Sequence, residues 1–562
     1  MLHRPEYGRV KQGVRDDLLE RVETVCGQNG ATMVRPAALG SGHANRWALV
    51  MAAVLSAGFV CLMVVMPLGA ILRYGGAESD WTVLADDYYQ WRILWTVLQA
   101  ALTCGVTACL GVPLAWVLAR FEFRGRRLLL RLLMLPFVMP TLVAGMGVLA
   151  LFGPKGLLPW DGSDTPWLLL YGNVFFNLPL VVRAVYQGLA SVPANRIRAA
   201  RTLGAGGWRV WWQIEWPVQL PWLAGGLCLV FLYCFSGFGL ALVLGGAQYA
   251  TVEVEIYQLI AHELDVASAS VLVWVSVGCS ALAALAYAVI SRRAVMPQHR
   301  QPLPLLRPQG WRQRTAVVLT VLVLLLCCAA PLLAIVWQAA QAGASWQVLG
   351  LPETHATVWN TTRFTAAALC LTVLLGVAHA AVARRWMLWR TATFLPFMVS
   401  PVCVAFGLLL LYPQWTASIW LLVATYALLA YPFVAKDVLA AWDPLPERYA
   451  QAARVLGARP SRVAWRVTGP LLLPALRRGL TFAAASCVGE FAATLFLSRP
   501  EWQTLTTLIY RYLGRAGAAN HDGAMVLSCV LMLVAMAVFM GLDSGDSLAE
   551  PERRRDVAVT RD

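Results

Sequence analysis

Long apolar stretches alternate with short polar segments along almost the whole chain. Twelve of these stretches hold about 20 mostly apolar residues, the length that a helix needs to cross a bilayer. A helix satisfies its own backbone hydrogen bonds in lipid, and the sequence shows no series of short alternating segments typical of a barrel. We therefore predict an all-α polytopic membrane protein. The predicted spans are 47–72, 93–119, 128–152, 167–189, 218–246, 270–291, 315–340, 361–383, 391–412, 416–439, 471–497 and 523–542.

One polar, basic segment between spans occurs twice, as Val192–Gly226 and as Leu445–Gly479. The two copies align without a gap at a constant offset of 253 residues. Each copy follows the fourth span of a set of six. The identical pairs are Pro193 and Pro446, Ala199-Ala200-Arg201 and Ala452-Ala453-Arg454, Leu203-Gly204-Ala205 and Leu456-Gly457-Ala458, Trp212 and Trp465, Pro217 and Pro470, Pro221 and Pro474, and Gly226 and Gly479.

The repeat predicts two parallel halves of six helices each, related by an axis along the membrane normal. Further matches at the same offset support this, since Tyr257 corresponds to Tyr510. The predicted domains are an N-terminal tail (1–46), a first half (47–291) with its loop at 192–226, a linker (292–314), a second half (315–542) with its loop at 445–479, and a C-terminal tail (543–562).

Basic residues are concentrated in alternate polar segments, and this distribution predicts how the chain is oriented in the membrane. The chain has 45 Lys and Arg against 30 Asp and Glu, a net charge of +15. Most of the basic residues, including those of both repeated loops, fall on one side if both termini are cytoplasmic. The tail 1–46 lacks the pattern of a signal peptide. Because the basic residues are spread over loops beside spans, they indicate contact with anionic membrane lipid rather than nucleic acid.

In each copy a short helix ends at a glycine, which suits the left-handed position after a helix. This pattern resembles the EAA loop of the permease subunits of bacterial ABC importers, although Arg198 and Gln451 replace its leading Glu. In that family the loop forms a coupling helix seated in a groove of a nucleotide-binding subunit. An amphipathic helix lying on lipid is the alternative. The resemblance implies that the ATPase-coupling residues are Ala199, Ala200, Gly204, Ala205, Ala452, Ala453, Gly457 and Ala458.

From residue 47 onward the chain is similar to the fused permeases of thiamine and ferric-ion importers. The similar stretches include VFFNLP (174–179), IEWP (214–217), ATVEVEIYQLI (250–260) and SCVGEFAATLF (486–496). The resemblance implies a permease in the bacterial inner membrane that carries thiamine or thiamine diphosphate from the periplasm to the cytoplasm. Two copies of a cytoplasmic ATPase and a periplasmic binding protein are the implied partners. Ferric ion is the alternative substrate, and a secondary transporter is a more distant alternative.

The chain carries no sequence that would bind ATP. The pattern G-x-x-x-x-G-K-[ST] is absent, and the only lysines are Lys11, Lys155 and Lys436. The ATP is therefore expected on the partner subunit, and this chain is expected to bind no cofactor and to catalyse no reaction. No spacing of Cys and His suggests a metal site.

Acidic residues within or beside spans are the remaining candidates for function. Glu490 in the eleventh span is either a translocation-pathway residue facing a cavity or the partner of a basic group that holds helices together. Glu253 and Glu255, on the outer side, are candidates for docking the binding protein, with solvated loop acids as the alternative. His379 in the eighth span is expected to be packed rather than to be a ligand.

Overall fold

The computed structural model describes residues 41–78, 81–159, 161–162, 164–291, 305–393, 396, 399–415 and 418–542. The chain divides into two units, Met1–Met51 and Ala52–Asp562, and the second holds almost all of the described residues. Most of the predicted N-terminal tail, most of the linker and all of the predicted C-terminal tail lie outside the described residues.

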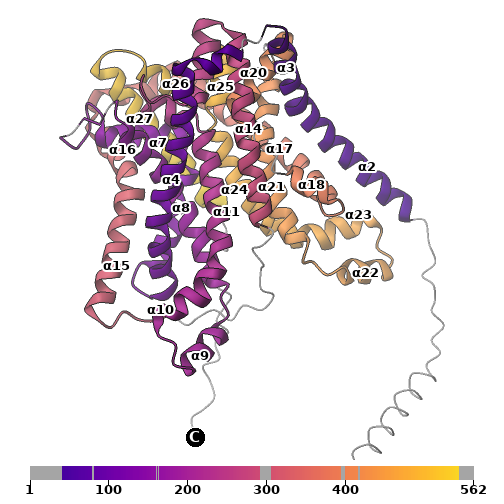
Figure 1. Ribbon diagram of the computed structural model, residues 1–562. Coiled ribbons are helices and arrows are strands. Elements are labelled where there is room, and N and C mark those ends of the chain that lie inside the picture. The colour runs from indigo at the N-terminus through magenta and orange to yellow at the C-terminus, as the bar shows by residue number, and fades with distance from the viewer. Residues whose placement is uncertain are drawn as a thin grey trace, which may run out of the picture. The chain divides into compact units, whose positions relative to one another are not determined.

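The described part of the chain consists of helices, with no strand beyond one isolated bridge between Phe121 and Leu306 (Figure 1). The helices of the first half are α2 (Ser41–Val60), α3 (Met66–Glu78), α4 (Asp87–Arg120), α5 (Arg126–Leu132), α6 (Leu135–Val138), α7 (Thr141–Phe152), α8 (Pro166–Ala190), α9 (Ala194–Thr202), α10 (Gly207–Val210), α11 (Trp216–Phe235), α12 (Gly239–Leu244), α13 (Val252–Gln258) and α14 (Val266–Ser291). Those of the second half are α15 (Trp311–Leu324), α16 (Ala330–Gln341), α17 (Pro352–Ala383), α18 (Met387–Ala392), α20 (Pro401–Leu411), α21 (Ile419–Trp442), α22 (Arg448–Val455), α23 (Pro460–Val463), α24 (Gly469–Val488), α25 (Ala492–Leu497), α26 (Leu505–Leu513) and α27 (Ala518–Leu542).

Ten continuous helices within the described residues are long and apolar enough to cross a membrane, where the sequence predicts twelve spans. The predicted third span is instead a bent pair, Arg126–Val138 and Thr141–Phe152, whose axes differ by 104°. Pro140 stands at the bend in an extended conformation, because its ring and missing N–H are incompatible with a continuing helix. In the predicted ninth span, the apolar helix α20 has only 11 residues.

The predicted fifth and eleventh spans are also interrupted, at equivalent positions. Helix α11 ends at Phe235 and α12 starts at Gly239, while α24 ends at Val488 and α25 starts at Ala492. A glycine lies in each break, Gly237 in the first half and Gly489 in the second. At Gly489 an added Cβ would lie 2.9 Å from Cα of Pro140. The break at Gly489 therefore lies directly against backbone of the first half.

The two halves repeat the same three-helix arrangement, in which α4, α8 and α11 correspond to α17, α21 and α24. Equivalent hydrogen bonds confirm the correspondence. The backbone N–H of Val252 donates to Thr96 Oγ1 at 2.9 Å, and that of Leu505 donates to Thr361 Oγ1 at 2.9 Å. Val252 and Leu505 are separated by the offset of 253 residues that relates the repeated loops.

The later part of the first membrane span of each half, α3 or α16, packs against the other half. An added Cβ at Gly147 in α7 would lie 2.9 Å from the carbonyl oxygen of Pro331 in α16. An added Cβ at Gly407 in α20 would lie 2.8 Å from Cβ of Pro67 in α3. Small residues at such crossings let two helix backbones approach closely, which is how helices associate in lipid. The halves are thus interlocked at two equivalent crossings.

Candidate functional site: two repeated loops and a central cavity

The two repeated loops have the same backbone structure. Helix α9 is followed by Gly204 with φ of +81°, and α22 is followed by Gly457 with φ of +79°. The N–H of Ala205 donates to the carbonyl oxygen of Ala200 at 3.0 Å, and the N–H of Ala458 donates to that of Ala453 at 3.0 Å. This 6→1 bond across a left-handed glycine is the Schellman motif, so the predicted helix ends are confirmed in both copies.

Both loops expose large apolar side chains, although apolar residues are usually covered in a folded protein. Leu203 is 87% exposed and its counterpart Leu456 is 86% exposed. Trp212 and Trp465, also equivalent, are 54% and 84% exposed. Of the predicted coupling residues, Ala199, Gly204, Ala452 and Gly457 are exposed, and Ala200, Ala205, Ala453 and Ala458 are half-buried. Exposed apolar patches of this kind mark interaction surfaces.

Each loop is joined rigidly to the helix bundle. The sequence predicts that the next span begins at Pro217 or Pro470, but one continuous helix runs from Gly207 to Phe235 and another from Pro460 to Val488. A turn of π-helix ends two residues before each of the prolines, at Trp211–Glu215 and at Ala464–Thr468. Such turns accommodate a proline, which has no N–H to donate. A displacement of either loop is therefore transmitted along a single helix.

The two loops differ in how they are anchored. In the first half the buried carboxylate of Glu215 pairs with Arg120 at the end of α4. The equivalent position in the second half is Thr468, which carries no charge. Ile197 of α9 is buried against its own loop, whereas α22 has no buried residue. The second loop instead has an exposed ion pair, between Glu447 and Arg384 at 3.8 Å, so the two loops are anchored by different contacts.

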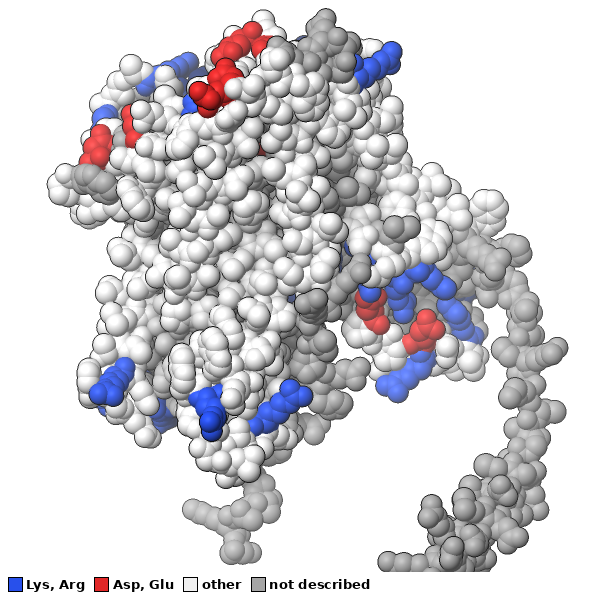
Figure 2. Space-filling model, in the orientation of Figure 1, with Lys and Arg blue, Asp and Glu red and all other residues white. Residues whose placement is uncertain are grey.

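Both loops lie at the same end of the unit. Figure 1 shows α9 and α22 at the end opposite to α20, α25 and α26. Most Lys and Arg side chains on the face drawn in Figure 2 lie near the end with the loops, and Asp and Glu gather mainly at the opposite end. An uncharged belt lies between them. This separation agrees with the predicted placing of the basic loops on one side of the membrane.

A cavity of about 240 Å³ lies between the two halves. Aromatic side chains of both halves form much of its wall, and ring pairs such as Phe137–Phe176 and Phe137–Tyr233, each 5.5 Å between centroids, line the first-half side. No Lys or Arg lines it among the described residues. Its polar lining residues are Thr141, Asn173, Asn177, Ser236, Ser486 and Glu490.

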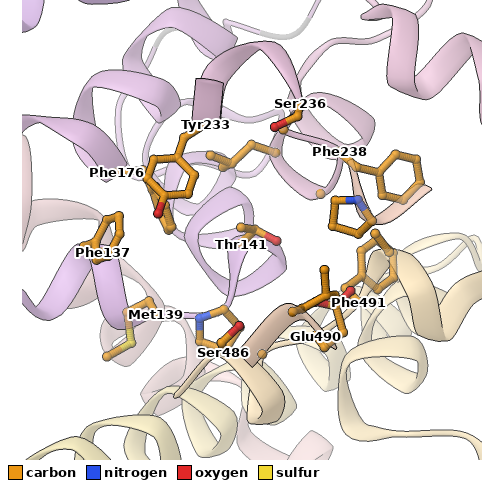
Figure 3. A pocket seen from close by; sticks show the side chains of 18 of the residues that line it. Phe137, Met139, Thr141, Phe176, Tyr233, Ser236, Phe238, Ser486, Glu490 and Phe491 are labelled. Atoms are coloured by element: carbon orange, nitrogen blue, oxygen red, sulfur yellow. The ribbon is translucent and has the colours of Figure 1, made fainter. Parts of the chain in front are cut away.

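Glu490 is the acidic residue that lines this cavity (Figure 3). Its Oε1 accepts the N–H of Ala493 at 3.0 Å, so the carboxylate lies at the start of α25. Among the described residues, no basic side chain pairs with it. In this conformation Glu490 therefore forms no ion pair with a described residue, and its role in translocation stays a prediction.

A row of four aromatic rings crosses the interface between the halves beside Glu490. Phe238 and Phe491 are equivalent positions, and their rings stack with centroids 5.9 Å apart. Tyr257 contacts Phe238 at 5.5 Å, and the equivalent Tyr510 contacts Phe491 at 5.3 Å. Figure 3 shows Phe238 and Phe491 side by side at the edge of the cavity. The row therefore follows the twofold relation of the repeat and joins the two halves.

Comparison with known proteins explains the duplicated arrangement. Residues 111–295 and 368–543 each match the family of binding-protein-dependent transport system inner membrane components. The chain belongs to this family. It is a duplicated permease of the ABC importer type, and a multi-pass protein of the inner membrane. The family implies an ATPase and a periplasmic binding protein as partners.

Named relatives of the permease are transport proteins. It is 28% identical over 524 residues to the thiamine transport system permease protein ThiP of Salmonella typhimurium, covering 85% of this chain and 94% of the relative. The ThiP protein of Escherichia coli shows the same identity and coverage. A shorter match, 32% identical over 198 residues, relates 34% of the chain to 72% of the Escherichia coli sulfate transport system permease protein CysT.

The structure corrects the expectation that Glu253 and Glu255 lie on an exposed outer loop. Both are on α13 of the permease and are buried. Glu253 accepts hydrogen bonds from Ser276 Oγ at 2.6 Å and from Ser400 Oγ of the other half. Glu255 pairs with Arg92 at 3.3 Å. A carboxylate removed from water needs such partners, and neither group is available to a docking protein in this conformation.

His379 lies within the second half of the permease, as expected for a packed side chain. It is buried, and its Nε2 lies 2.9 Å from Thr393 Oγ1 and 3.0 Å from the carbonyl oxygen of Trp389. The described residues hold no group of three or more possible metal ligands.

Sequence reasoning missed the aromatic row and the two asparagines of the permease cavity. A signal was available for the row, because Phe238 and Phe491 are separated by the same offset of 253 residues as the loops. Asn177 lies in the stretch VFFNLP (174–179) and Asn173 directly precedes it, but nothing in one sequence indicates which face of α8 meets the cavity.

Proposed function

We propose that this permease carries thiamine or thiamine diphosphate from the periplasm to the cytoplasm, driven by a separate ATPase docked on the two repeated loops. The observation that carries the substrate assignment is the central cavity. Its mainly apolar wall includes aromatic rings of both halves, it holds the carboxylate of Glu490, and no basic side chain lines it among the described residues. Aromatic faces and a carboxylate attract a flat organic cation such as the thiazolium ring of thiamine.

The relatives named as thiamine transport permeases support the same substrate. The cavity also argues against sulfate, the substrate named for a more distant relative. An anion beside an unpaired carboxylate would be repelled, and basic or N–H groups would be expected in its place. By the same argument the cavity favours thiamine, whose charge is the cationic ring, over thiamine diphosphate. The size of the cavity, about 240 Å³, suits a small molecule rather than a peptide.

The coupling assignment rests on the exposed apolar residues of the two loops, Leu203 and Trp212 in one and Leu456 and Trp465 in the other. Two equivalent surfaces are expected to bind two copies of one ATPase subunit. The basic character of both loops supports the proposal that they, and both chain termini, are on the cytoplasmic side.

In the proposed cycle, closure of the two ATPase subunits on ATP moves both loops. Because each loop continues into one rigid helix, Gly207–Phe235 or Pro460–Val488, the movement rocks the two halves against each other. The aromatic row separates when the cavity opens to the periplasm and closes again when the substrate leaves inward. This is a population shift between two arrangements of packed halves.

The test is uptake by cells that lack their own thiamine importer. Cells supplied with this permease, its ATPase and its binding protein should accumulate radiolabelled thiamine in the presence of an energy source, and cells without the permease should not. Uptake of ferric ion and of sulfate is measured in parallel. A gain in iron or sulfate uptake with no gain in thiamine uptake would show that the substrate assignment is wrong.

A further inference from the structure

Two asparagine side chains of α8 line the cavity, and both use their NH2 groups inside the protein. Asn173 Nδ2 donates to Gln99 Oε1 at 2.7 Å. Asn177 Nδ2 donates to the carbonyl oxygen of Asn173 at 3.0 Å and lies 3.3 Å from Cys234 Sγ. Gln99 is fixed in turn, because its Nε2 donates to the carbonyl oxygen of Cys234 at 2.9 Å. The NH2 groups of both asparagines thus form hydrogen bonds within the protein.

The side-chain carbonyl oxygens of the same two residues have no such partner. Within the described part of the chain, the Oδ1 atoms of Asn173 and Asn177 accept no hydrogen bond. Asn177 is 1% exposed, and its Oδ1 is a buried acceptor without a partner. Such an atom is unfavourable as long as it stays unpaired. A ligand that supplies an N–H or O–H at this wall would remove that cost.

Because of the asparagines and Glu490, the two halves contribute different polar groups to the cavity. The second-half residues equivalent to Asn173 and Asn177 are Tyr426 and Ala430, which offer no amide. Conversely, the first-half residue equivalent to Glu490 is Gly237. The first half therefore supplies neutral acceptors, and the second half supplies the charged acceptor. A ligand with an uncharged hydrogen-bond donor at one end and a positive charge at the other fits this arrangement.

We infer that the side-chain carbonyl oxygens of Asn173 and Asn177 recognise the amino group of a cationic heteroaromatic amine, while Glu490 receives its charged ring. The inference rests on the proposed function and deepens it, because thiamine carries an aminopyrimidine at one end and a thiazolium at the other. In an analogue with oxygen in place of the amino group, that oxygen would face the Oδ1 atoms of the asparagines, and neither side could donate a hydrogen bond. Sites built to hydrogen-bond one substrate group reject analogues that lack it far better than apolar pockets reject small changes in size.

The experiment compares uptake of thiamine with uptake of oxythiamine, in which oxygen replaces the pyrimidine amino group. The ratio of the two rates is measured in cells with the native permease and with Asn177→Ser, whose hydroxyl can donate as well as accept. The binding protein is the same in both strains, so its own selectivity cancels. We expect the ratio to fall about tenfold in the variant, which corresponds to about 1.4 kcal/mol. Asn173→Ser should lower it in the same direction.

The matched control is Asn520→Ser, a change of the same kind far from the cavity, where Nδ2 donates to the carbonyl oxygen of Ala516 at 2.8 Å. It should leave the ratio unchanged. If Asn177→Ser abolishes uptake of both compounds, the inference is tested with Asn177→Asp instead. This variant keeps an acceptor oxygen and should keep the native ratio.

An unchanged ratio in Asn177→Ser, a collapsed ratio in Asn177→Asp, or loss of all uptake in both variants at native protein levels would overturn the inference. In each of these cases Asn177 would not determine the selectivity between thiamine and oxythiamine. Failure of the proposed function is a separate result, because then the native permease itself would give no thiamine uptake.

Discussion

Glu490 combines two roles in one side chain. One carboxylate oxygen accepts the N–H of Ala493 at the start of α25, and the side chain lines the cavity. A glutamine can keep the hydrogen bond through its Oε1 but has no charge. The Glu490→Gln variant therefore separates the structural role from the electrostatic one.

We expect Glu490→Gln to assemble normally and to lower thiamine uptake about tenfold, or about 1.4 kcal/mol. The measurement is initial uptake rate normalised to the amount of permease in the membrane. Glu122→Gln, an exposed position away from the cavity, is the control and should have no effect. Native uptake by Glu490→Gln would contradict a role for its charge.

Burial of Glu253 predicts a pH-dependent stability. Burial raises the pKa of this carboxyl to about 7, although Ser276, Ser400 and Cys403 hydrogen-bond to it and oppose the rise. Between the ordinary pKa of a glutamate and 7, the unfolded chain is ionised while the folded protein still holds the proton. The free energy of unfolding therefore falls as the pH rises through this window and levels off above it.

We expect the melting temperature of the purified native protein to drop by about 1–3 °C between pH 5 and pH 8 on account of this group. The Glu253→Gln variant, which cannot ionise, should lose that part of the drop. Thermal unfolding in detergent at several pH values measures it. An identical pH dependence in the native protein and the variant would show that Glu253 does not titrate in this range.

At the scale of single elements, the ends of α9 and α22 depend on a left-handed glycine. An added Cβ at Gly204 or Gly457 would meet no atom within 4 Å, so only the backbone conformation opposes a larger residue. That conformation costs an ordinary residue about 1–2 kcal/mol. The change would therefore distort the loop without disturbing the packing of the membrane helices.

We expect Gly204→Val and Gly457→Val each to reduce both copurification of the ATPase and thiamine uptake severalfold. Gly206→Val is the matched control, because Gly206 has φ of −67° and also has free space around its Cα. It should have a much smaller effect. Substrate-stimulated ATP hydrolysis at the native level in the double variant would rule out the loops as the coupling sites.

The row formed by Tyr257, Phe238, Phe491 and Tyr510 is an element of the interface rather than of either half. A stacked aromatic pair contributes about 0.5–1.5 kcal/mol beyond its buried area. Removing one ring by Phe238→Ala or Phe491→Ala should shift the equilibrium between closed and open halves by about two- to tenfold. We expect basal ATP hydrolysis without the binding protein to rise by that factor. Unchanged basal hydrolysis would indicate that the row does not hold the halves together.

At the same scale, the periodicity of the sequence predicted the helices well but not their breaks. Apolar runs located every long helix, because a span must be apolar over its whole length. The bend at Pro140 and the breaks near Gly237 and Gly489 were missed, since prolines and glycines also occur inside intact membrane helices, as Pro113 does in α4. These breaks are what place Glu490 and Phe238 at the cavity.

For the whole molecule, the repeat offset of 253 residues was the most informative single feature. It predicted the two halves, their parallel orientation and the pairing of the two loops. It could not predict where the halves depart from symmetry, at Glu490 against Gly237, at Asn177 against Ala430 and at Glu215 against Thr468. The sequence alone does not show what these differences do. The structure shows that Glu490, Gly237 and Asn177 line one cavity.

The burial of Glu253 and Glu255 could not be read from the sequence for a related reason. The partners of Glu253 include Ser400, 147 positions away in the other half. Arg92, the partner of Glu255, belongs to α4. A polar stretch between two spans gives no sign of such distant contacts, so solvent exposure was the natural expectation.

The central claim is that this chain forms a thiamine pathway driven through two loops. The most direct measurement is thiamine accumulation in proteoliposomes that contain the purified permease and its ATPase, with the binding protein outside and ATP inside. We expect accumulation that stops when any one component is omitted and is lost in the Gly204→Val, Gly457→Val double variant. Accumulation without ATP, or native accumulation by the double variant, would contradict the account.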